Sequence, residues 1–483
     1  MKLLPALVLA ALTVSAAEPR VFTNAAGKQI KATLEGVSNG QATIVLEDGR
    51  KFTLGVTTFS PADQEYFKGQ AAAPKLTGKN DKLAPGEVNS AVGAELFSDQ
   101  PLWASTPESV AGRLQIRPES KTKEQASFRT YTRGDEKVFG AHPYSIALYG
   151  EKEQVTSLSL VFANKGDLFS SRGSSENHFD KDTPPAEAAK IVRTAMDKDL
   201  AAISTALTAK LGEPVKERFG ERGAARMNMQ RWDWRGHAIL LADAEDDDKN
   251  GEYVGVQVVP TAVADAGGKT KPVPDAVVRA RAKENIEKRP SGDVVITDIP
   301  MVDQGPKGYC VPATMERAMR FMSMPADMYV LANAGNSGYG GGTSVEVLLE
   351  NTGRLIRSKG RSFDSWSGEM KLNNLSKHID KGVPVIWALY STKEFNDTAN
   401  RRKDERASVA DWAQWKTKVT TEAASNKMEK DKEKGHVVLI IGYNKETNEI
   451  AFSDSWGERF KERWITVPEA DLISQGRFYV IGF

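Results

Sequence analysis

Residues 303–314, DQGPKGYCVPAT, contain Cys310, the only cysteine of the chain. With no second cysteine among 483 residues, this thiol has no disulfide partner within the chain. Apolar residues follow it at helical spacing, and Pro312 fits the first turn of a helix, where a missing N–H costs nothing. The pattern therefore predicts that Cys310 begins a helix. The helix dipole and the unsatisfied amides of the first turn favour a thiolate there, so we expect a nucleophilic cysteine.

Length and composition indicate several domains and an exported protein. A chain of 483 residues is too long for one hydrophobic core. Its 65 Lys and Arg balance 64 Asp and Glu, so a formal charge of +1 gives no sign of a nucleic-acid or anionic membrane partner. Residues 1–17 combine a lysine, an apolar run and three small residues, which is the layout of a cleaved secretory signal. We expect a periplasmic or secreted protein with no membrane span after cleavage; uncleaved anchoring is the alternative.

Residues 18–68 form a strand-rich unit. Turn signals at Gly27-Lys28, Ser38-Asn39-Gly40 and Asp48-Gly49 separate short alternating segments, which predicts hairpins of a small barrel. Together with the closing stretch 59–66, these turns resemble the SLA-one homology module, an SH3-like β-barrel. The resemblance implies a short peptide as a possible ligand, and an accessory barrel without a ligand is the alternative.

A linker at residues 69–87 leads into a middle region at 88–260. Paired strands at 144–149 and 155–162, a long helix at 184–211 ended by Gly212, and strands at 231–234, 237–242 and 253–259 predict an α+β domain. Within this region the sequence offers no nucleophile and base pair, so its role is unknown.

One motif in the middle region, Asp246–Gly251, has the ligand spacing of a calcium loop. However, its twelfth position is Gln257 instead of Glu, and strands flank it. An acidic hairpin turn is therefore the better interpretation, and we expect no metal site. We expect Trp232, Trp234 and His237 nearby to be core residues.

After a linker and helix at 261–292, a last domain spans 293–483. His436 opens an apolar strand, and Asp454 ends a second strand across a short turn. In an antiparallel hairpin these two side chains lie close together, so Asp454 could orient the imidazole that draws the proton from Cys310. Gln304, six residues before the cysteine, could lend an amide to an oxyanion hole.

The order Gln304, Cys310, His436, Asp454 resembles that of the papain-like cysteine peptidases. The segment from Gln304 to Cys310 keeps their spacing, and residues 454–457, DSWG, mirror their Asn-Ser-Trp-Gly. Asp in place of Asn is most similar to the bacteriocin-leader-processing peptidases and their bacterial relatives, the C-thirty-nine-like group. This resemblance implies a papain-like fold for 293–483. Pro312 departs from the family pattern, and no transporter segments follow, so leader processing is not implied.

These residues predict an exported cysteine peptidase that hydrolyses peptides or proteins without a cofactor. Gln304 and the Cys310 backbone N–H would stabilise the oxyanion. The alternatives are a catalytically inert peptide-binding or scaffolding protein of the cell envelope, and a thiol amidase or transpeptidase. A charged insertion at 393–434, with a helix expected at 407–424, is either a lid over the site or a solvated decoration.

Overall fold

The computed structural model describes residues 19–38, 41–70, 80–168, 183–246, 249–306, 308–338 and 342–483. These residues belong to two compact units, Met1–Thr77 and Gly78–Phe483. The predicted signal at 1–17 lies outside the described residues. Across the described ranges, no helix is long and apolar enough to cross a membrane. Both units combine helices and strands, which confirms the mixed fold class.

The first unit is an antiparallel sheet with one helix packed on it. Its elements are β1 (Arg20–Thr23), β2 (Gln29–Ser38), β3 (Gln41–Leu46), β4 (Lys51–Gly55), η1 (Val56–Thr58) and α1 (Pro61–Gln70). The strands pair in the order β1-β2-β3-β4. Gly27 and Gly49 occupy the predicted turns with φ of 78° and 84°, which glycine adopts readily. The predicted turn residues Asn39 and Gly40 lie outside the described residues.

This sheet is open, which corrects the expectation of a closed barrel. In the described part of the unit, β1 and β4 are opposite edges, and the backbone after β4 pairs with the β1 side at a single isolated bridge, between Asn24 and Phe59. Helix α1 covers the sheet in place of a closing strand, since its Phe67 stacks on Phe22 at 5.2 Å and both rings are fully buried. The resemblance to the SLA-one homology module and the short-peptide ligand remain predictions.

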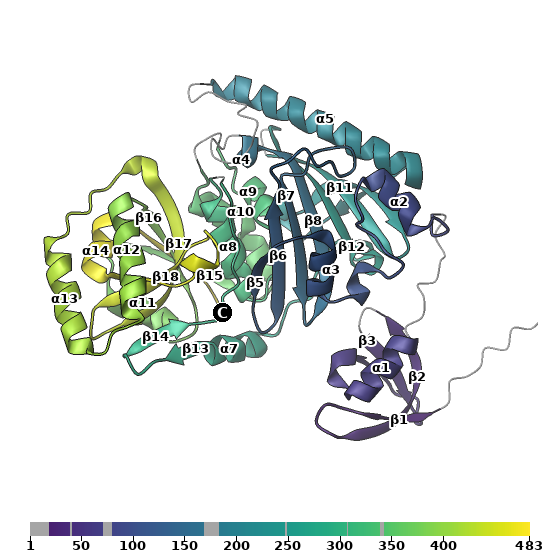
Figure 1. Cartoon of the computed structure of the whole chain (residues 1–483), viewed down its shortest axis with the longest axis horizontal. Helices are drawn as coiled ribbons and strands as arrows, with labels where there is room; N and C mark the ends of the chain where they lie inside the picture. Colours follow the sequence, from purple (N-terminus) through teal and green to yellow (C-terminus); the bar gives the residue numbers. More distant parts are fainter. Residues whose placement is uncertain are drawn as a thin grey trace, which may run out of the picture. The chain divides into compact units, whose positions relative to one another are not determined.

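The second unit begins with an eight-stranded antiparallel sheet. Its strands are β5 (Pro118–Lys121), β6 (Gln125–Tyr131), β7 (Ser145–Glu151), β8 (Gln154–Asn164), β9 (Val215–Phe219), β10 (Met227–Trp234), β11 (His237–Glu245) and β12 (Gly251–Pro260), in the order β5-β6-β7-β8-β12-β11-β10-β9. The helices of this region are α2 (Pro85–Val92), η2 (Leu102–Ala104), α3 (Pro107–Leu114), α4 (Lys165–Leu168), α5 (Pro185–Leu211), η3 (Gly223–Ala225) and α6 (Thr261–Asp265). The long α5 runs across one face of the sheet (Figure 1).

Alternation along β8 gives this sheet two buried faces. Leu160 and Phe162 belong to the core under α5, whereas Val161 between them belongs to a cluster with helix α9 (Met328–Ala334) of the C-terminal region. The middle and C-terminal regions therefore share a hydrophobic cluster. This shared cluster brings the middle sheet next to the elements that carry Cys310.

Several sequence predictions in the middle region are confirmed. The predicted strands correspond to β7, β8 and β10–β12, and the predicted helix to α5, which ends at Gly212 with φ of 80°. Trp232, Trp234 and His237 are buried core residues. Burial lowers the pKa of His237 to about 4, so this ring is neutral.

The acidic motif lies where β11 and β12 pair antiparallel, as expected for a hairpin turn. Asp246 accepts a hydrogen bond from the Asn250 backbone N–H at 2.8 Å. Asp247 and Asp248 lie outside the described residues.

Residues 80–87, expected to belong to a linker, are folded onto the middle region. Asp81 is buried and accepts a hydrogen bond from the Arg235 backbone N–H at 2.6 Å. The Leu83 carbonyl accepts one from the Trp234 indole at 3.2 Å. These long-range contacts have no local sequence pattern, so the stretch looked like a linker.

The C-terminal region is a second antiparallel sheet with helices on both faces. Its strands are β13 (Ile286–Lys288), β14 (Asp293–Ile296), β15 (Ser362–Ser367), β16 (Val385–Tyr390), β17 (Gly435–Asn444), β18 (Glu449–Ser453), β19 (Arg463–Thr466) and β20 (Ser474–Gly482). Its helices are α7 (Asp275–Glu284), α8 (Cys310–Phe321), α9 (Met328–Ala334), α10 (Val345–Ser358), α11 (Leu372–Ile379), α12 (Lys393–Arg406), α13 (Trp412–Ser425), η4 (Lys432–Lys434), η5 (Glu458–Phe460) and α14 (Val467–Ile473). The order is β13-β14-β17-β16-β20-β15, with β18 and β19 continuing from β17.

Strand β17 alternates between two cores. Val437 and Leu439 pack with α8 and α10, whereas Val438 and Ile440 pack with Phe395 of α12 on the other face. The strand that begins beside His436 is thus fixed from both sides.

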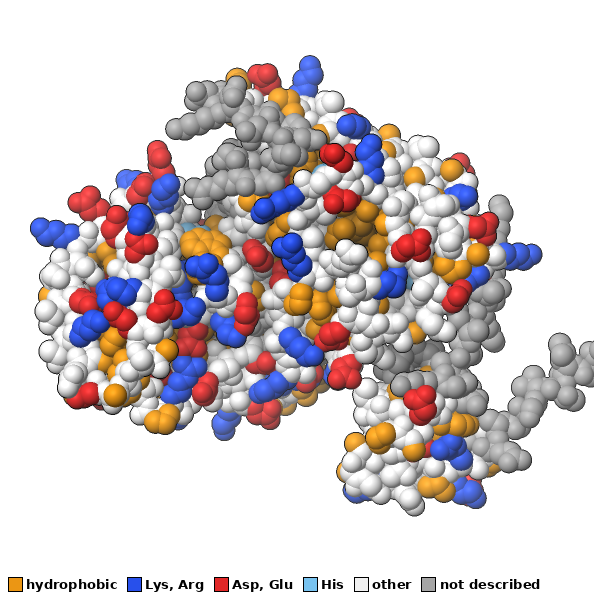
Figure 2. All heavy atoms as spheres, viewed as in Figure 1, with side chains coloured by type: hydrophobic (Ala, Val, Ile, Leu, Met, Phe, Trp, Pro, Cys, Tyr) orange, Lys and Arg blue, Asp and Glu red, His pale blue; other side chains and the backbone are white. Residues whose placement is uncertain are grey.

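On the outer surface, Lys and Arg side chains are interspersed with Asp and Glu over the visible face (Figure 2), in keeping with the formal charge of +1.

Candidate active site

Cys310 is the first residue of α8, as predicted, and is partly exposed. The predicted apolar face of the helix is buried. One turn further, Thr314 donates a hydrogen bond to the Val437 carbonyl at 3.1 Å. Because Val437 follows His436 directly, this bond fixes the start of α8 against the start of β17.

His436 and Asp454 meet as the predicted hairpin requires. Strands β17 and β18 pair antiparallel, His436 lies near the start of the first, and Asp454 follows the end of the second. The imidazole Nε2 lies 2.9 Å from Asp454 Oδ1, and both side chains are buried. Since Asp454 occupies Nε2, the nitrogen left for the thiol is Nδ1.

His436 has a pKa raised to about 10. Burial lowers this pKa, but the charge and hydrogen bond of Asp454 raise it, and a hydrogen bond and charge from Cys310 add to the rise. The imidazole is therefore protonated near neutral pH. An imidazolium beside a cysteine at a helix start is the setting in which a thiolate is stabilised.

Asp454 is held on its other side by Arg463, which the sequence did not suggest. Arg463 Nη2 donates to Asp454 Oδ2 at 2.7 Å, and neither side chain has exposed surface. Arg463 Nη1 donates in turn to Asn396 of α12 at 2.8 Å. The Ser455 backbone N–H adds a bond to Asp454 Oδ1 at 2.8 Å. Each carboxylate oxygen is thus fixed by donors from the protein.

The insertion at 393–434 is a folded part of the core. It contains α12, which was not expected, in addition to α13, which corresponds to the helix predicted at 407–424. Phe395, Ala399 and Arg402 of α12 are fully buried, and Arg402 forms a buried ion pair with Glu469. The interpretation as a solvated decoration is therefore wrong.

Trp456 packs on the imidazole, and Gln304 is bonded to the residue before Trp456. The Trp456 ring stacks on His436 with centroids 4.8 Å apart and planes at 29°. The Ser455 carbonyl between Asp454 and Trp456 accepts a hydrogen bond from the Gln304 backbone N–H at 2.9 Å, and Gln304 is buried. The loop before Cys310 and the end of β18 are therefore one connected structure that links all four predicted site residues.

His378, the other histidine of the C-terminal region, is not part of the candidate site. It was expected to face solvent, but it is half-buried and stacks on Trp366 at 5.1 Å. Burial lowers its pKa. Its surroundings therefore disfavour the imidazolium, unlike those of His436, and it serves as a comparison.

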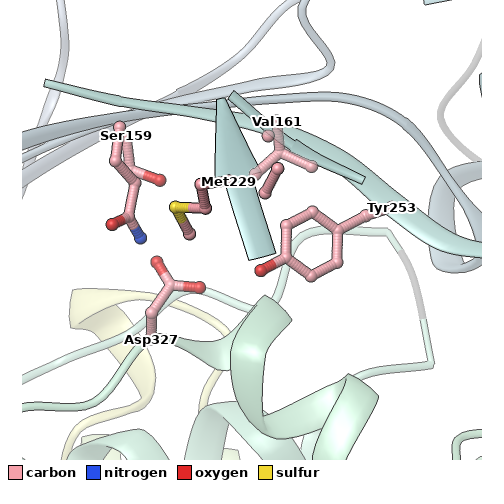
Figure 3. Close-up of a pocket in the computed structure, with 8 residues that line it drawn as sticks. Ser159, Val161, Met229, Tyr253 and Asp327 are labelled. Atoms are coloured by element: carbon pink, nitrogen blue, oxygen red, sulfur yellow. The ribbon is translucent and has the colours of Figure 1, made fainter. Parts of the chain in front are cut away.

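Two cavities lie among the described residues of the second unit. One, of about 10 Å³, has room for about one water; the Tyr253 hydroxyl, the Asp327 carboxylate and the Met229 sulfur point into it (Figure 3). The other, of about 980 Å³, lies between the stretch 132–144 and α5. Neither is lined by a predicted site residue. Among the described residues, no group of three or more His, Cys, Asp or Glu side chains could hold a metal ion.

Residues 296–481 match the model of the Peptidase_C39 like family. This is the region that resembles the C-thirty-nine-like group in sequence, and the match confirms that resemblance. No curated protein matches the chain.

Three solved structures are similar to parts of the chain. The first is the peptidase domain of Streptococcus ComA, a bifunctional ABC transporter of a quorum-sensing pathway, with 13% identity, 38% of this chain and 96% of that chain covered, and a TM-score of 0.25. The second is a double-glycine-motif protease from an AMS/PCAT transporter in complex with the leader peptide. It has 14% identity, with 38% of this chain and 90% of that chain covered, and a TM-score of 0.23. The third is xylellain, a cysteine protease from Xylella fastidiosa. It has 12% identity, with 44% of this chain and 91% of that chain covered, and a TM-score of 0.27.

Proposed function

We propose that the protein is an exported cysteine peptidase in which Cys310 attacks the peptide carbonyl. The observation that carries this proposal is the raised pKa of His436, about 10, caused by Asp454 and Cys310 against the effect of burial. A protonated imidazole at neutral pH beside a thiol at a helix start supports a thiolate and imidazolium pair.

In the proposed reaction, the Cys310 thiolate adds to the substrate carbonyl, and the Cys310 backbone N–H and the Gln304 side chain stabilise the oxyanion. The imidazolium of His436 then gives its proton to the leaving amine as the thioester forms. Water, deprotonated by the neutral imidazole, then attacks the thioester, which releases the acid and restores the thiolate and imidazolium pair. Asp454 keeps the ring in place and stabilises its charge, and Arg463 holds Asp454.

Alkylation of Cys310 tests the proposal without a substrate. At pH 6 a model thiol is almost entirely protonated, so we expect Cys310 to react with iodoacetamide about 100-fold faster than glutathione. His436→Ala should remove the advantage, whereas His378→Ala should keep it. Cys310→Ala should leave no reactive thiol and no peptidase activity. Equal rates for Cys310 and glutathione would mean an inert, structural cysteine and would favour a peptide-binding or scaffolding role.

Export is proposed from the signal pattern at residues 1–17 alone. We expect expression in a bacterial host to yield a mature chain that starts at Glu18. N-terminal sequencing of the periplasmic or secreted fraction checks this, and an intact Met1 in that fraction would contradict it.

A further inference from the structure

The loop before Cys310 is attached to the middle sheet as well as to its own domain. The Tyr131 hydroxyl of β6 donates a hydrogen bond to the Asp303 carbonyl. The Tyr131 ring also packs against Gly305, where an added Cβ would lie 2.7 Å from it. Gly305 has φ of 67°, a conformation that suits glycine. Tyr131 therefore touches the residues on both sides of Gln304.

Two more groups of the middle sheet hold the same segment. The Asp303 backbone N–H donates to Glu119 Oε1 at 3.0 Å, and the Met301 backbone N–H donates to Ser120 Oγ at 2.9 Å. Glu119 is itself paired with Arg129 at 2.6 Å, and both side chains are buried. Because the ion pair with Arg129 fixes Glu119, Glu119 is a rigid support for the segment around Asp303.

The residue before the nucleophile is held by the same sheet. The Tyr309 hydroxyl donates to Glu252 Oε1 of β12 at 3.0 Å and accepts a bond from the Gly166 backbone N–H at 3.2 Å. Glu252 is paired with Lys165 at 3.2 Å, and both are buried. The segment before Cys310 is thus bonded to the middle sheet, and the helix after it is bonded to β17 through Thr314.

The side chains of the middle region that hold this segment lie outside residues 296–481, the part that matches the peptidase family: Glu119, Ser120, Tyr131 and Glu252. We propose that the middle sheet is a positioning platform for the oxyanion side of the candidate active site, and that Tyr131 is the positioning residue for Gln304. This proposal rests on the proposed function, because it assigns a role to the middle region in that same reaction.

The geometry explains why Tyr131 matters most among these contacts. Gln304 is bonded on one side, through its backbone N–H, to the Ser455 carbonyl. On the other side, Tyr131 restrains the carbonyl before it and the glycine after it. Burial raises the pKa of Tyr131 well above its usual value, so the phenol remains a donor at every working pH. A displacement of about 1 Å at a catalytic group can lower a rate about 100-fold.

Two reactions of Cys310 separate positioning from general damage. Alkylation by iodoacetamide displaces iodide from a saturated carbon and forms no oxyanion, so it reports only the thiolate and imidazolium pair. Acylation by p-nitrophenyl acetate passes through an oxyanion before the thioester forms and p-nitrophenolate leaves. The burst of p-nitrophenolate measures this step in the full-length protein.

We expect Tyr131→Phe, which keeps the ring but removes the hydroxyl, to slow acylation about tenfold and to change alkylation less than twofold. Tyr131→Ala, which also frees Gly305, should slow acylation further. The matched control is Tyr253→Phe. Tyr253 lies in the same hydrophobic cluster, but its hydroxyl contacts the Met227 sulfur, at 3.7 Å. This control should leave both rates within twofold of the wild type.

The outcomes distinguish the two proposals. If the wild type shows no enhanced alkylation, the proposed function fails. If the wild type is reactive but Tyr131→Phe acylates at the wild-type rate, or loses alkylation and acylation equally, the positioning role of Tyr131 is refuted.

Discussion

Replacing Asp454 by Asn tests the electrostatic core of the site. The imidazole and the carboxylate are joined at 2.9 Å, which puts their charge centres about 4 Å apart. At an effective dielectric constant of about 20, this attraction is about 4 kcal/mol, or about 3 pKa units. Arg463 already offsets part of the Asp454 charge, so a drop of about 2 to 3 units is the expected size.

The direction follows from the charges. The folded-state pKa of His436 is raised to about 10, so the imidazolium is present below that pH and is lost as the pH rises through it. Removing the anion lowers this pKa, whereas Arg463 is present in both proteins and does not change the direction. We therefore expect the pH at which the imidazolium is lost to fall from about 10 in the wild type to about 7 or 8 in Asp454→Asn.

The assay is the pH profile of Cys310 alkylation by iodoacetate, divided by that by iodoacetamide. The iodoacetate anion is drawn to the imidazolium, so the ratio falls when His436 loses its proton. Asp380→Asn is the matched control, because Asp380 accepts a hydrogen bond at 2.6 Å from Tyr443 of the same strand and does not touch the site. If the ratio falls at the same pH in the wild type and in Asp454→Asn, Asp454 does not stabilise the His436 charge and the reasoning is refuted.

Three further predictions concern the supports of the site and the division of the chain. Arg463→Met should lower the free energy of unfolding by about 3 to 5 kcal/mol in urea titrations, because Asp454 would be left buried without its cation; a loss under about 1 kcal/mol would contradict this. Phe395→Ala should cost about 3 to 5 kcal/mol in the same measurement, since Phe395 is fully buried and its ring lies 5.2 Å from that of Phe452; an unchanged midpoint would mean that α12 is not part of the core. Limited proteolysis should cut first near residue 77, between the two compact units, and leave Cys310 alkylation within twofold; a loss of alkylation would mean that the first unit belongs to the site.

Local sequence patterns were enough to predict those parts of the site that depend on a single segment of the chain. The helix that begins at Cys310 could be predicted because its apolar period and Pro312 lie within a few residues of the thiol. The pairing of His436 with Asp454 could be predicted because the two residues belong to one hairpin. Periodicity and turn chemistry act over short distances along the chain, which is where sequence reasoning is reliable.

The supports could not be predicted, because no local sequence pattern indicates which residues they join. Arg463 is a single charged residue at the start of a strand, and nothing beside it indicates that it reaches Asp454 and Asn396. Helix α12 is so rich in charge that its buried stripe of Phe395, Ala399 and Arg402 was hidden. Tyr131 precedes Asp303 by 172 residues, so only the folded chain brings them together.

These supports reach the site from different parts of the fold and act on different steps. On the side of α12, Arg463 holds Asp454, which raises the pKa of His436 and so supports the imidazolium of the proposed reaction. On the side of the middle sheet, Tyr131 holds the loop of Gln304, which bears on the oxyanion. The two sides meet at the bond between the Gln304 backbone N–H and the Ser455 carbonyl. The buried Arg317 also joins them, because it donates to the carbonyls of Pro300 and Ser453. Damage to the α12 side should therefore change alkylation and acylation together, whereas damage to the sheet side should change acylation alone.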